Sequence, residues 1–475
     1  MTAKPSTLHI YNTLTRKKQE FTPLTPGHIK LYTCGPTVYD YAHIGNFRAF
    51  LFEDLLKRWL KYHNYKVTHI MNLTDIDDKT IKGSQTKAIP LKQFTEFYIK
   101  AFFEDIKTLN IQPADHYPKA TDHIPEMVTL IKTLLVKNIA YKSEDGSIYF
   151  SVTKFSNYGK LAHIKINELK TGARVNQDEY AKEEAQDFAL WKAWTPQDGQ
   201  VYWQTELGKG RPGWHIECSA MSMKYLGETF DIHCGGVDNM FPHHENEIAQ
   251  SEAATNKKFA IYWMHNEHLQ VEGKKMSKRL GNFYTLRDLL SKGYDPIAIR
   301  YLLISTHYRQ QFNFTFEGLQ SATTTIERLR NFARRLQKVE TPTTDTDKPA
   351  TLTTQLQEQF NNAMDDDLNI TIALAHLFEF IREFNSLLDA NLVNKTQATK
   401  TLDLIMQLDT VLGVIGKIEP IETLPSDIDT LVQKREDARK AKNWREADAI
   451  RDQLKTMGII LEDTTQGIKW YRKKT

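Results

Sequence analysis

The sequence is poor in cysteine: its three cysteines, Cys34, Cys218 and Cys234, lie far apart along a chain of 475 residues. An odd and scattered set argues against a disulfide framework and leaves the thiols available as metal ligands or nucleophiles in a reducing compartment. The sequence also lacks any run near the roughly 18 apolar residues that a membrane helix needs. The first fifteen residues contain no apolar core of signal-peptide length. We therefore expect a cytoplasmic protein that does not enter a membrane.

An excess of one charge is also lacking, because 62 Lys and Arg nearly balance 59 Asp and Glu. The balance hides an uneven distribution. Residues 431–475 carry 12 Lys and Arg against 7 Asp and Glu, whereas the preceding 430 residues carry 50 against 52. Basic charge gathered at one end is typical of a segment that binds a polyanion, although a solvated helix face followed by a lysine-rich tail explains it equally well.

What the sequence does contain is a strand, helix, strand pattern near its beginning. A β-rich run at 29–33 is followed by apolar residues at helical spacing from about His43, and a second strand is expected over 66–73. Such a unit predicts a parallel sheet. A ligand crevice is expected at the carboxyl ends of its strands, where Cys34 and residues 72–75 lie.

The rest of the chain is organised around this sheet. Strand patterns resume only at 230–233 and 259–264, so the irregular stretch 113–211, with its charged run 176–186, is interpreted as an insertion. Helical patterns follow as far as Gly416, interrupted by a Thr-, Pro- and Asp-rich run at 341–354 that is typical of a flexible connection. The last 50 residues predict two charged helices and a short β end. The predicted fold class is α/β: a Rossmann-like parallel-sheet domain with an inserted domain, then an α-helical bundle and a small mixed C-terminal domain.

A candidate metal site lies in the segment 241–247, FPHHENE, which is predicted to open a helix with its proline in the first turn. His243 and Glu247 are four residues apart and share one helix face, whereas the histidine between them is expected to point away. With two thiolates they would complete the four-ligand shell that Zn²⁺ prefers. The pattern does not decide which cysteines take part, and His233 is a further candidate. Cys234 is more simply explained as a small buried residue.

Two further segments suit a nucleotide. His43, Gly45 and Asn46 lie where the first strand turns into its helix, and the amides at a helix N-terminus favour phosphate. A helix-capping role is the simpler alternative for His43. The lysine-rich run 273–281, bracketed by glycines, is interpreted as a mobile loop that could stabilise a phosphoryl transition state, although such runs are more often solvated surface. No Walker A pattern occurs, which disfavours a P-loop site.

In combination these segments resemble the class I aminoacyl-tRNA synthetases: a His-Ile-Gly-Asn element at 43–46, an insertion, a Lys-Met-Ser-Lys loop at 275–278 and a helical C-terminal region. Three long motifs are similar to those of the cysteinyl-tRNA synthetase family, namely TCGPTVY at 33–39, WHIECSAM at 214–221 and FPHHENEIAQS at 241–251. The resemblance covers almost the whole chain and includes WREAD at 444–448 and LEDT at 461–464. Three motifs in the right order make it highly specific.

The resemblance implies ATP-dependent activation of L-cysteine to cysteinyl-adenylate and its transfer to tRNA(Cys), with Mg²⁺ accompanying ATP. One Zn²⁺ per chain would bind the substrate thiol and be held by Cys34, Cys218, His243 and Glu247. The catalytic residues would be His43, Asn46, Lys275 and Lys278, and ATP would be bound by His43, Gly45, Asn46 and Lys278. The amino acid would be bound by Thr74, Trp214, His233 and Asp238, the last pairing with its ammonium group.

The resemblance also implies a domain organisation and a monomer. The catalytic domain would comprise 1–112 and 212–265, around a connective domain at 113–211 that lacks editing activity. The lysine loop and stem-contact region (266–317), a helical anticodon-stem bundle (318–425) and a small basic anticodon-binding domain (426–475) would follow. In the last domain Trp444 or Trp470 would stack on anticodon bases, unless both belong to its core.

Some positions depart from the family pattern. Asn46 stands where class I motifs often have a second histidine, Arg279 replaces a usual serine of the lysine loop, and Cys234 replaces an expected glycine. None of these removes a metal ligand or a necessary cation. Two other functions stay open. A ligase that joins cysteine to an amino sugar is disfavoured by the basic last segment, and a catalytically inactive RNA-binding paralogue is disfavoured because the phosphate and metal candidates are all present.

Overall fold

The centre of the fold is a parallel sheet of four strands. The computed structural model describes residues 7–164, 187–340, 346–418, 426–464 and 467–472. The sheet has the order β11 (Ala260–Asn266), β10 (Phe230–Gly236), β3 (His28–Thr33), β4 (Lys66–Met71). Side chains on both of its faces are buried, including Leu31, Tyr32 and Ile232, as in parallel sheets that helices cover on both sides. The predicted parallel sheet is confirmed.

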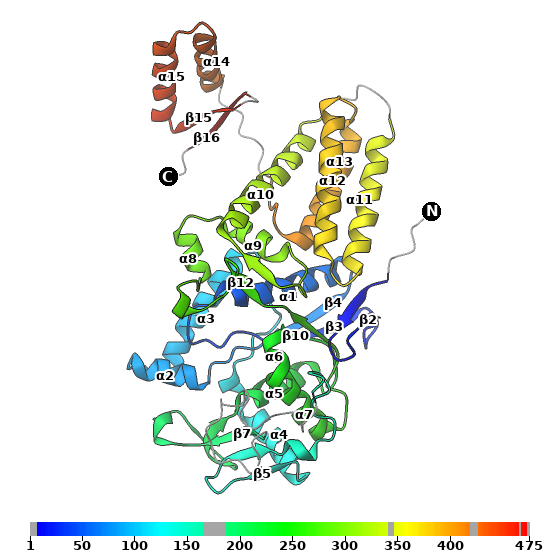
Figure 1. The fold of residues 1–475 in the computed structure, drawn as a ribbon, viewed down its shortest axis with the longest axis vertical. Helices are drawn as coiled ribbons and strands as arrows, with labels where there is room; N and C mark the ends of the chain where they lie inside the picture. Colours follow the sequence, from blue (N-terminus) through cyan, green and yellow to red (C-terminus); the bar gives the residue numbers. More distant parts are fainter. Residues whose placement is uncertain (1–6, 165–186, 341–345, 419–425, 465–466, 473–475) are drawn as a thin grey trace. The chain divides into compact units, whose positions relative to one another are not determined.

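Two helical crossovers place the crevice of this sheet. Helix α1 (Ile44–Tyr62) connects β3 to β4, and α7 (Glu245–Thr255) connects β10 to β11. Because such crossovers are right-handed and these two run outward from the middle of the sheet in opposite directions, they cover opposite faces (Figure 1). The strand order therefore reverses between β3 and β10, where Thr33 pairs with Cys234. The carboxyl ends of these two strands form the crevice at which open α/β sheets bind ligands.

The segment interpreted as an insertion contains an antiparallel sheet of five strands. Its order is β5 (Ala140–Lys142), β6 (Ile148–Phe150), β7 (Phe188–Ala193), β9 (Gly208–Pro212), β8 (Trp203–Thr205). The sequence indicates only one of these strands, a short one near 147–150 that corresponds to β6. The charged run 176–186 lies outside the described residues. Leu130 of α4 (Ile124–Val136), Trp191 of β7 and Ile216 of α5 (Trp214–Leu226) share one buried core. The insertion thus packs directly on α5, the helix that carries Cys218.

Shorter elements complete this half of the chain. The hairpin β1 (His9–Asn12) and β2 (Lys17–Glu20) precedes the sheet, and α2 (Asp78–Thr86) and α3 (Leu91–Thr108) follow β4. Next to the crevice, β12 (Leu269–Val271) lies between β13 (Lys274–Lys275) and β14 (Phe312–Phe314). Glu272 and Gly273 connect β12 to β13 with φ of 49° and 71°, the positive values that a tight two-residue hairpin requires. Single turns lie at Ala120–His123, Val152–Lys154, Pro196–Asp198, Val237–Asn239, Met240–His244 and Lys278–Leu280.

A helical bundle follows α8 (Leu286–Ser291) and α9 (Pro296–Ile304). It consists of α10 (Phe316–Gln337), α11 (Lys348–Asp365), α12 (Ile370–Asp389) and α13 (Lys395–Leu412), packed through buried residues such as Leu329, Phe360, Phe384 and Leu408. The flexible connection expected at 341–354 is wrong in its second half, because α11 begins at Lys348 with Pro349 in its first turn, where a proline costs no hydrogen bond.

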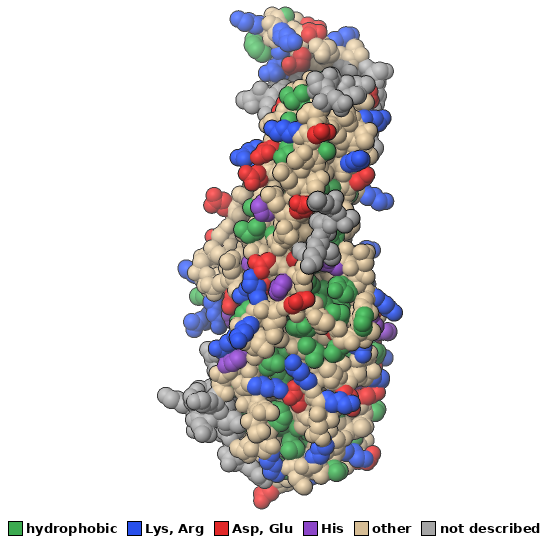
Figure 2. Space-filling view, turned by 90° about the vertical axis from the view of Figure 1, so that its right-hand side faces the viewer, with side chains coloured by type: hydrophobic (Ala, Val, Ile, Leu, Met, Phe, Trp, Pro, Cys, Tyr) green, Lys and Arg blue, Asp and Glu red, His purple; other side chains and the backbone are tan. Residues whose placement is uncertain are grey.

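Figure 2 shows acidic and basic side chains interspersed over one face, in keeping with the balanced charge of the chain.

Arg300 on α9 ties the bundle to the sheet. It is fully buried, its Nη2 lies 2.6 Å from Asp54 Oδ2 on α1, and its Nε donates to the carbonyl of Leu412 at the end of α13, at 2.8 Å. Gly413 follows with φ of 67°, and a Cβ there would lie 3.0 Å from Arg300 Nε. The position requires glycine for its backbone conformation and for the close approach of the guanidinium.

The chain beyond Gly416 forms a second compact unit, residues 417–475. Helices α14 (Ser426–Lys440) and α15 (Trp444–Thr456) share a small core with the hairpin β15 (Ile459–Thr464) and β16 (Gly467–Arg472), which are the two helices and β end that the sequence predicts. Trp444 is 59% exposed and so is not a core residue, whereas the side chain of Trp470 lies outside the described part of the chain. Across the described residues, no helix combines the length and apolar character needed to span a membrane.

We expect Gly413→Ala to lower the free energy of unfolding of residues 1–416 by about 2–3 kcal/mol, because it adds both left-handed strain and a contact with a buried guanidinium. Gly416→Ala is the matched control: its φ is 71° and nothing lies within 4 Å of the added Cβ, so only the strain of about 1–2 kcal/mol applies. Urea unfolding of both variants measures the difference. Equal losses would show that Arg300 adapts freely to the added methyl group.

Candidate functional site

A cavity of about 770 Å³ lies at the carboxyl ends of β3 and β10. Backbone as well as side chains shapes it: Gly35 follows β3, and a Cβ there would lie 1.8 Å from the carbonyl oxygen of Asn72 after β4. Only glycine lets the two strand ends approach this closely. The lining includes Cys34, Asp40, Tyr41, His43, Gly45, Asn46, Thr74, Lys79, Trp214, Cys218, Asp238, His243, Lys275 and Met276.

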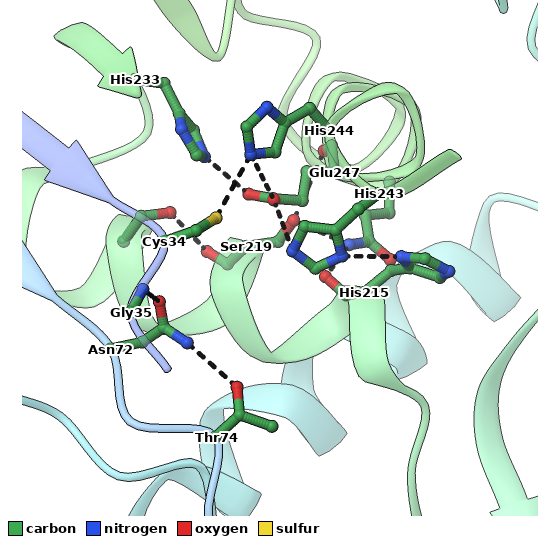
Figure 3. A network of polar contacts seen from close by, with 12 residues as sticks. Cys34, Gly35, Asn72, Thr74, His215, Ser219, His233, His243, His244 and Glu247 are labelled. Carbon is green, nitrogen blue, oxygen red and sulfur yellow. Dashed lines mark hydrogen bonds and ion pairs between the residues drawn. The ribbon is translucent and has the colours of Figure 1, made fainter. Parts of the chain in front are cut away.

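Four side chains that could hold a metal ion converge beside this cavity, and three of them, Cys34, Cys218 and His243, line it. Figure 3 shows Cys34, His243 and Glu247 of this group. Cys34 follows β3, Cys218 lies in the second turn of α5, and His243 and Glu247 flank the start of α7. Their ligand atoms, two sulfurs, one nitrogen and one oxygen, all lie within 4.8 Å of one another. His243 Nε2 is 3.0 Å from Glu247 Oε1. The structure thus brings together the four residues to which the resemblance assigns a metal.

Burial and mutual contact set the protonation of these groups. The Cys34 thiol donates a hydrogen bond to Cys218, which lowers the pKa of Cys218 to about 6 and raises the pKa of Cys34. Burial alone would raise the pKa of Glu247, but His233 and His243 lower it to about 2. Burial alone would lower the pKa of His243, but Glu247 and Cys218 raise it to about 10. Without a metal at pH 7.5, a thiolate and a carboxylate therefore face one imidazolium.

A second set of ligand atoms overlaps the first and consists of Cys34, His233, His244 and Glu247. His244 Nε2 lies 3.2 Å from Cys34 Sγ, so the expectation that His244 points away is wrong. The reason is local: residues 240–244 form a π turn in which Phe241 is extended (φ −138°, ψ 129°), and α7 begins only at Glu245. The proline of this segment therefore does not occupy the first turn of α7.

Surrounding rings hold the imidazoles in place. The Trp214 ring stacks on His243 with centroids 4.1 Å apart, and His215 Nδ1 lies 2.9 Å from His243 Nδ1, which leaves Nε2 facing Glu247. Such outer contacts fix the orientation of metal-binding imidazoles. Cys234 is fully buried in β10 and, among the described residues, belongs to neither set of candidate ligands.

His43 caps helix α1. Its Nδ1 accepts a hydrogen bond from the amide of Asn46, and the Asn46 side-chain oxygen accepts one from the amide of His43, both at 3.1 Å. Burial lowers the pKa of His43 to about 4, so the ring is neutral at pH 7 and its proton lies on Nε2. The capping role and a donor role toward phosphate are therefore compatible. At Gly45 a Cβ would lie 3.0 Å from the His43 ring, which explains the glycine.

The lysine loop borders the same cavity. Lys275 lines it, while Lys278 Nζ lies 2.6 Å from Asp40 Oδ2 and 5.0 Å from the centre of the Phe283 ring. Both partners of this ion pair are partly exposed, so it contributes at most about 1 kcal/mol and a phosphate can displace it. Arg279, the departure from the family pattern, is exposed.

Three of the four residues expected to bind the amino acid line the cavity: Thr74, Trp214 and Asp238. His233 lies elsewhere. It is fully buried, its Nε2 is 2.9 Å from Glu247 Oε2, and its ring stacks on Trp263 with centroids 4.5 Å apart. In this structure His233 therefore contacts a candidate metal ligand and is not part of the cavity surface.

Comparison with known proteins identifies the family. Residues 20–324 match the family model of the tRNA synthetases class I (C) catalytic domain, residues 359–416 match the DALR domain, and residues 422–470 match the cysteinyl-tRNA ligase anticodon binding domain. The cysteine–tRNA ligases of Protochlamydia amoebophila and Chlamydia felis are each 52% identical, over 465 and 470 residues, and 97% of both partners is covered in each case. The chain belongs to the cysteinyl-tRNA ligase family.

Solved structures of other class I synthetases share the fold of this cysteinyl-tRNA ligase family member. Methionyl-tRNA synthetase of Mycobacterium tuberculosis in complex with methionyl-adenylate has a TM-score of 0.61 at 15% identity, covering 82% of this chain and 90% of that one. A putative arginyl-tRNA synthetase of Campylobacter jejuni has a TM-score of 0.56 at 13% identity, covering 82% and 94%. At such low identity the likeness shows the fold alone.

Sequence reasoning missed residues of this cysteinyl-tRNA ligase site that act through others. Asp40 holds Lys278, and Asn282 braces the loop, since its oxygen accepts from the Ser277 amide at 2.9 Å and its amide donates to the Lys275 carbonyl at 3.1 Å. Isolated Asp and Asn residues in loops carry no pattern of their own. Of these two residues, only Asp40 could have been suspected from the sequence, because it lies between the first strand and the helix that follows it, where the ligand crevice is predicted.

We expect metal binding to be strongly pH-dependent. Zn²⁺ added to metal-free protein at pH 7.5 should release about two protons, one from Cys34 and one from His243, because the ligands bind deprotonated while the pKa values of both groups lie above this pH. The apparent affinity should therefore rise with pH between 7 and 9 and fall more steeply below 6, where Cys218 also takes up a proton.

Calorimetric titration in buffers of different ionisation enthalpy counts the released protons. Cys234→Ala removes a thiol outside both ligand sets and is the control; it should release the same number. An affinity independent of pH would contradict the assigned protonation states.

Proposed function

We propose that this protein activates L-cysteine with ATP to form cysteinyl-adenylate and then transfers the cysteine to tRNA(Cys). The observation that carries the proposal is the convergence of Cys34, Cys218, His243 and Glu247 beside a cavity. The first three of these residues line that cavity, together with His43 and Lys275 of the lysine loop. The same cavity therefore has candidate metal ligands at one side and, at another, His43 and the lysine loop, which can bind phosphate. The relatives named cysteine–tRNA ligase support the same reaction.

The metal that fits these four ligands is Zn²⁺. Two sulfurs, one imidazole nitrogen and one carboxylate oxygen form a four-ligand donor set that Zn²⁺ accepts, whereas Mg²⁺ and Ca²⁺ prefer oxygen ligands alone. When bound there, Zn²⁺ would supply a Lewis acid that lowers the pKa of the substrate thiol from about 8.5 and holds it as a thiolate. Mg²⁺ is proposed only as the partner of ATP.

This arrangement gives a physical reason for rejecting serine. A hydroxyl is a far weaker acid and a harder donor than a thiol, so serine would lose a metal bond, whereas one methylene in an apolar pocket distinguishes substrates by only about 1–3 kcal/mol. A separate editing site is then unnecessary. We accordingly propose that residues 113–211 form a connective domain without editing activity.

The other cavity residues divide the remaining tasks. Asp238 would pair with the substrate ammonium group, while Thr74 and Trp214 would border the bound amino acid. The neutral His43 would donate from Nε2 to a phosphate oxygen of ATP, near Gly45 and Asn46 at the start of α1. Lys275 and Lys278 would stabilise the negative charge that develops at the α-phosphate as the cysteine carboxylate attacks and pyrophosphate leaves.

Domain boundaries and cellular setting follow as proposals. Residues 1–112 and 212–265 would form the catalytic domain, 266–317 the loop and stem-contact region, 318–425 the anticodon-stem bundle and 426–475 the anticodon-binding domain of a cytoplasmic monomer. The exposed ring of Trp444 supports a stacking role, because an unpaired base can reach it. The balanced body and basic end of the chain fit a division between ATP chemistry and RNA binding.

Aminoacylation of tRNA(Cys) with cysteine or serine tests the proposal. We expect charging with cysteine alone, and we expect Cys218→Ala to abolish both the bound zinc and the charging, while Cys234→Ala keeps both. Zinc content is measured on the same preparations by mass spectrometry. Transfer of cysteine to an amino sugar in place of tRNA, or RNA binding without adenylate formation, would favour one of the two rival functions.

Lys278→Ala should lower the rate of cysteine-dependent pyrophosphate exchange about 100-fold or more, because a cation that acts only in the transition state is lost. Cysteine binding should change little, since the residues proposed to contact the amino acid are Thr74, Trp214 and Asp238 and not Lys278. The control is Lys274→Ala, an exposed lysine of the same loop (273–281) that does not line the cavity either and should have a small effect on both. A larger loss in cysteine affinity than in exchange rate would contradict the assigned role.

A further inference from the structure

An exposed patch of aromatic rings and cations lies at the mouth of the cavity and takes no part in the proposed adenylate chemistry. Helices α2 and α3 lie side by side there (Figure 1), because Gly83 leaves room for the Phe94 ring: a Cβ at Gly83 would lie 2.3 Å from Phe94 Cζ. On α3 the Phe97 side chain is 54% exposed. A large exposed aromatic ring beside a cavity indicates a candidate binding surface.

The rings form a continuous track from the cavity to the surface. Tyr41, which lines the cavity, has its ring centroid 6.0 Å from that of Phe97 and 5.6 Å from that of Tyr98. Lys87, just after α2, places its Nζ 5.7 Å from the centre of the Phe97 ring and donates to the Tyr98 hydroxyl at 3.1 Å. The exposed Phe97 ring therefore has a cation beside it.

The charge around this track favours an anion. Lys79 Nζ lies 5.1 Å from the centre of the Tyr39 ring, which is itself 36% exposed, and the Arg287 guanidinium lies 4.9 Å from the centre of the Tyr41 ring. The neighbouring carboxylates contact cations other than Lys79 and Lys87: Glu96 pairs with Lys92, Glu104 and Asp105 pair with Arg287, and Asp40 pairs with Lys278 as long as no phosphate displaces it. Lys79 and Lys87 are exposed and available to phosphates.

We propose that Tyr41, Phe97 and Lys87 form a stacking platform for the unpaired 3′ end of tRNA on its way into the cavity. Aromatic rings beside cations bind single-stranded nucleic acid without regard to sequence, because every base has a flat face and every nucleotide a phosphate. The inference rests on the proposed function, which requires the terminal ribose to reach the adenylate. A protein partner fits less well, because the track continues into the cavity that would hold the nucleotide.

Phe97→Ala should raise the KM for tRNA in aminoacylation about tenfold, the loss expected for one base–aromatic stack, while pyrophosphate exchange changes less than about twofold. Phe97→Tyr should restore the low KM, because it keeps the ring. Phe103→Ala is the matched control. It removes a 37% exposed phenylalanine of the same helix whose ring lies 4.9 Å from Tyr117, and it should leave the KM unchanged.

Direct binding separates this platform from other tRNA contacts. An acceptor-stem minihelix with its unpaired 3′ nucleotides should bind the wild-type chain more tightly than the same minihelix without them, and Phe97→Ala should remove this preference. An unchanged preference in the variant, or equal effects of Phe97→Ala and Phe103→Ala, would overturn the platform. Failure of the wild-type chain to charge tRNA at all would instead overturn the proposed function.

Discussion

The structure depends on bringing two sulfurs, an imidazole and a carboxylate to one buried point. These groups come from three elements far apart in the sequence, the end of β3, the second turn of α5 and the start of α7. Burial without a metal leaves them as a costly mixture of charges, which only their mutual contacts offset. The constraint is therefore on relative position: β3, α5 and α7 must be fixed against one another before the site exists.

The insertion takes part in meeting this constraint. Its five-stranded sheet shares a buried core with α4 and α5, and this core also includes Ala249 of α7. The helix that supplies Cys218, α5, is therefore packed between the parallel sheet and the inserted sheet. Glu245 at the start of α7 accepts hydrogen bonds from the amides of Gly159, Leu161 and Ala162 in the insertion, each at 2.9 Å. The insertion thus holds both helices that carry ligands, in addition to any role it has toward RNA.

The sequence predicted the elements that have strong local signals and the residues that belong to long motifs. Strands β3 and β4 are β-rich runs on either side of a segment with apolar residues at helical spacing, and the pair His243 and Glu247 was predicted from its spacing of four residues. The strands of the inserted sheet are only three to six residues long, too short for a periodic signal. The π turn at 240–244 could not be read from helix rules, because it changes the direction in which His244 points. Contacts such as Asp40 with Lys278 exist only once the chain has folded.

The two ends of the cavity differ in the sign and in the solvent exposure of their charged groups. At the buried end, anionic groups are desolvated and locked by rings and hydrogen bonds, which suits the selection of one thiol by fixed geometry. At the open end, the lysines are solvent-exposed, and Lys278 is held by a weak ion pair with Asp40 that a polyphosphate can replace. His43 lies between them and is neutral, so it adds a directed donor without a charge. The rigid, buried cluster would therefore select the substrate thiol, whereas the exposed lysines, which can still move, would stabilise the charge that develops during the reaction.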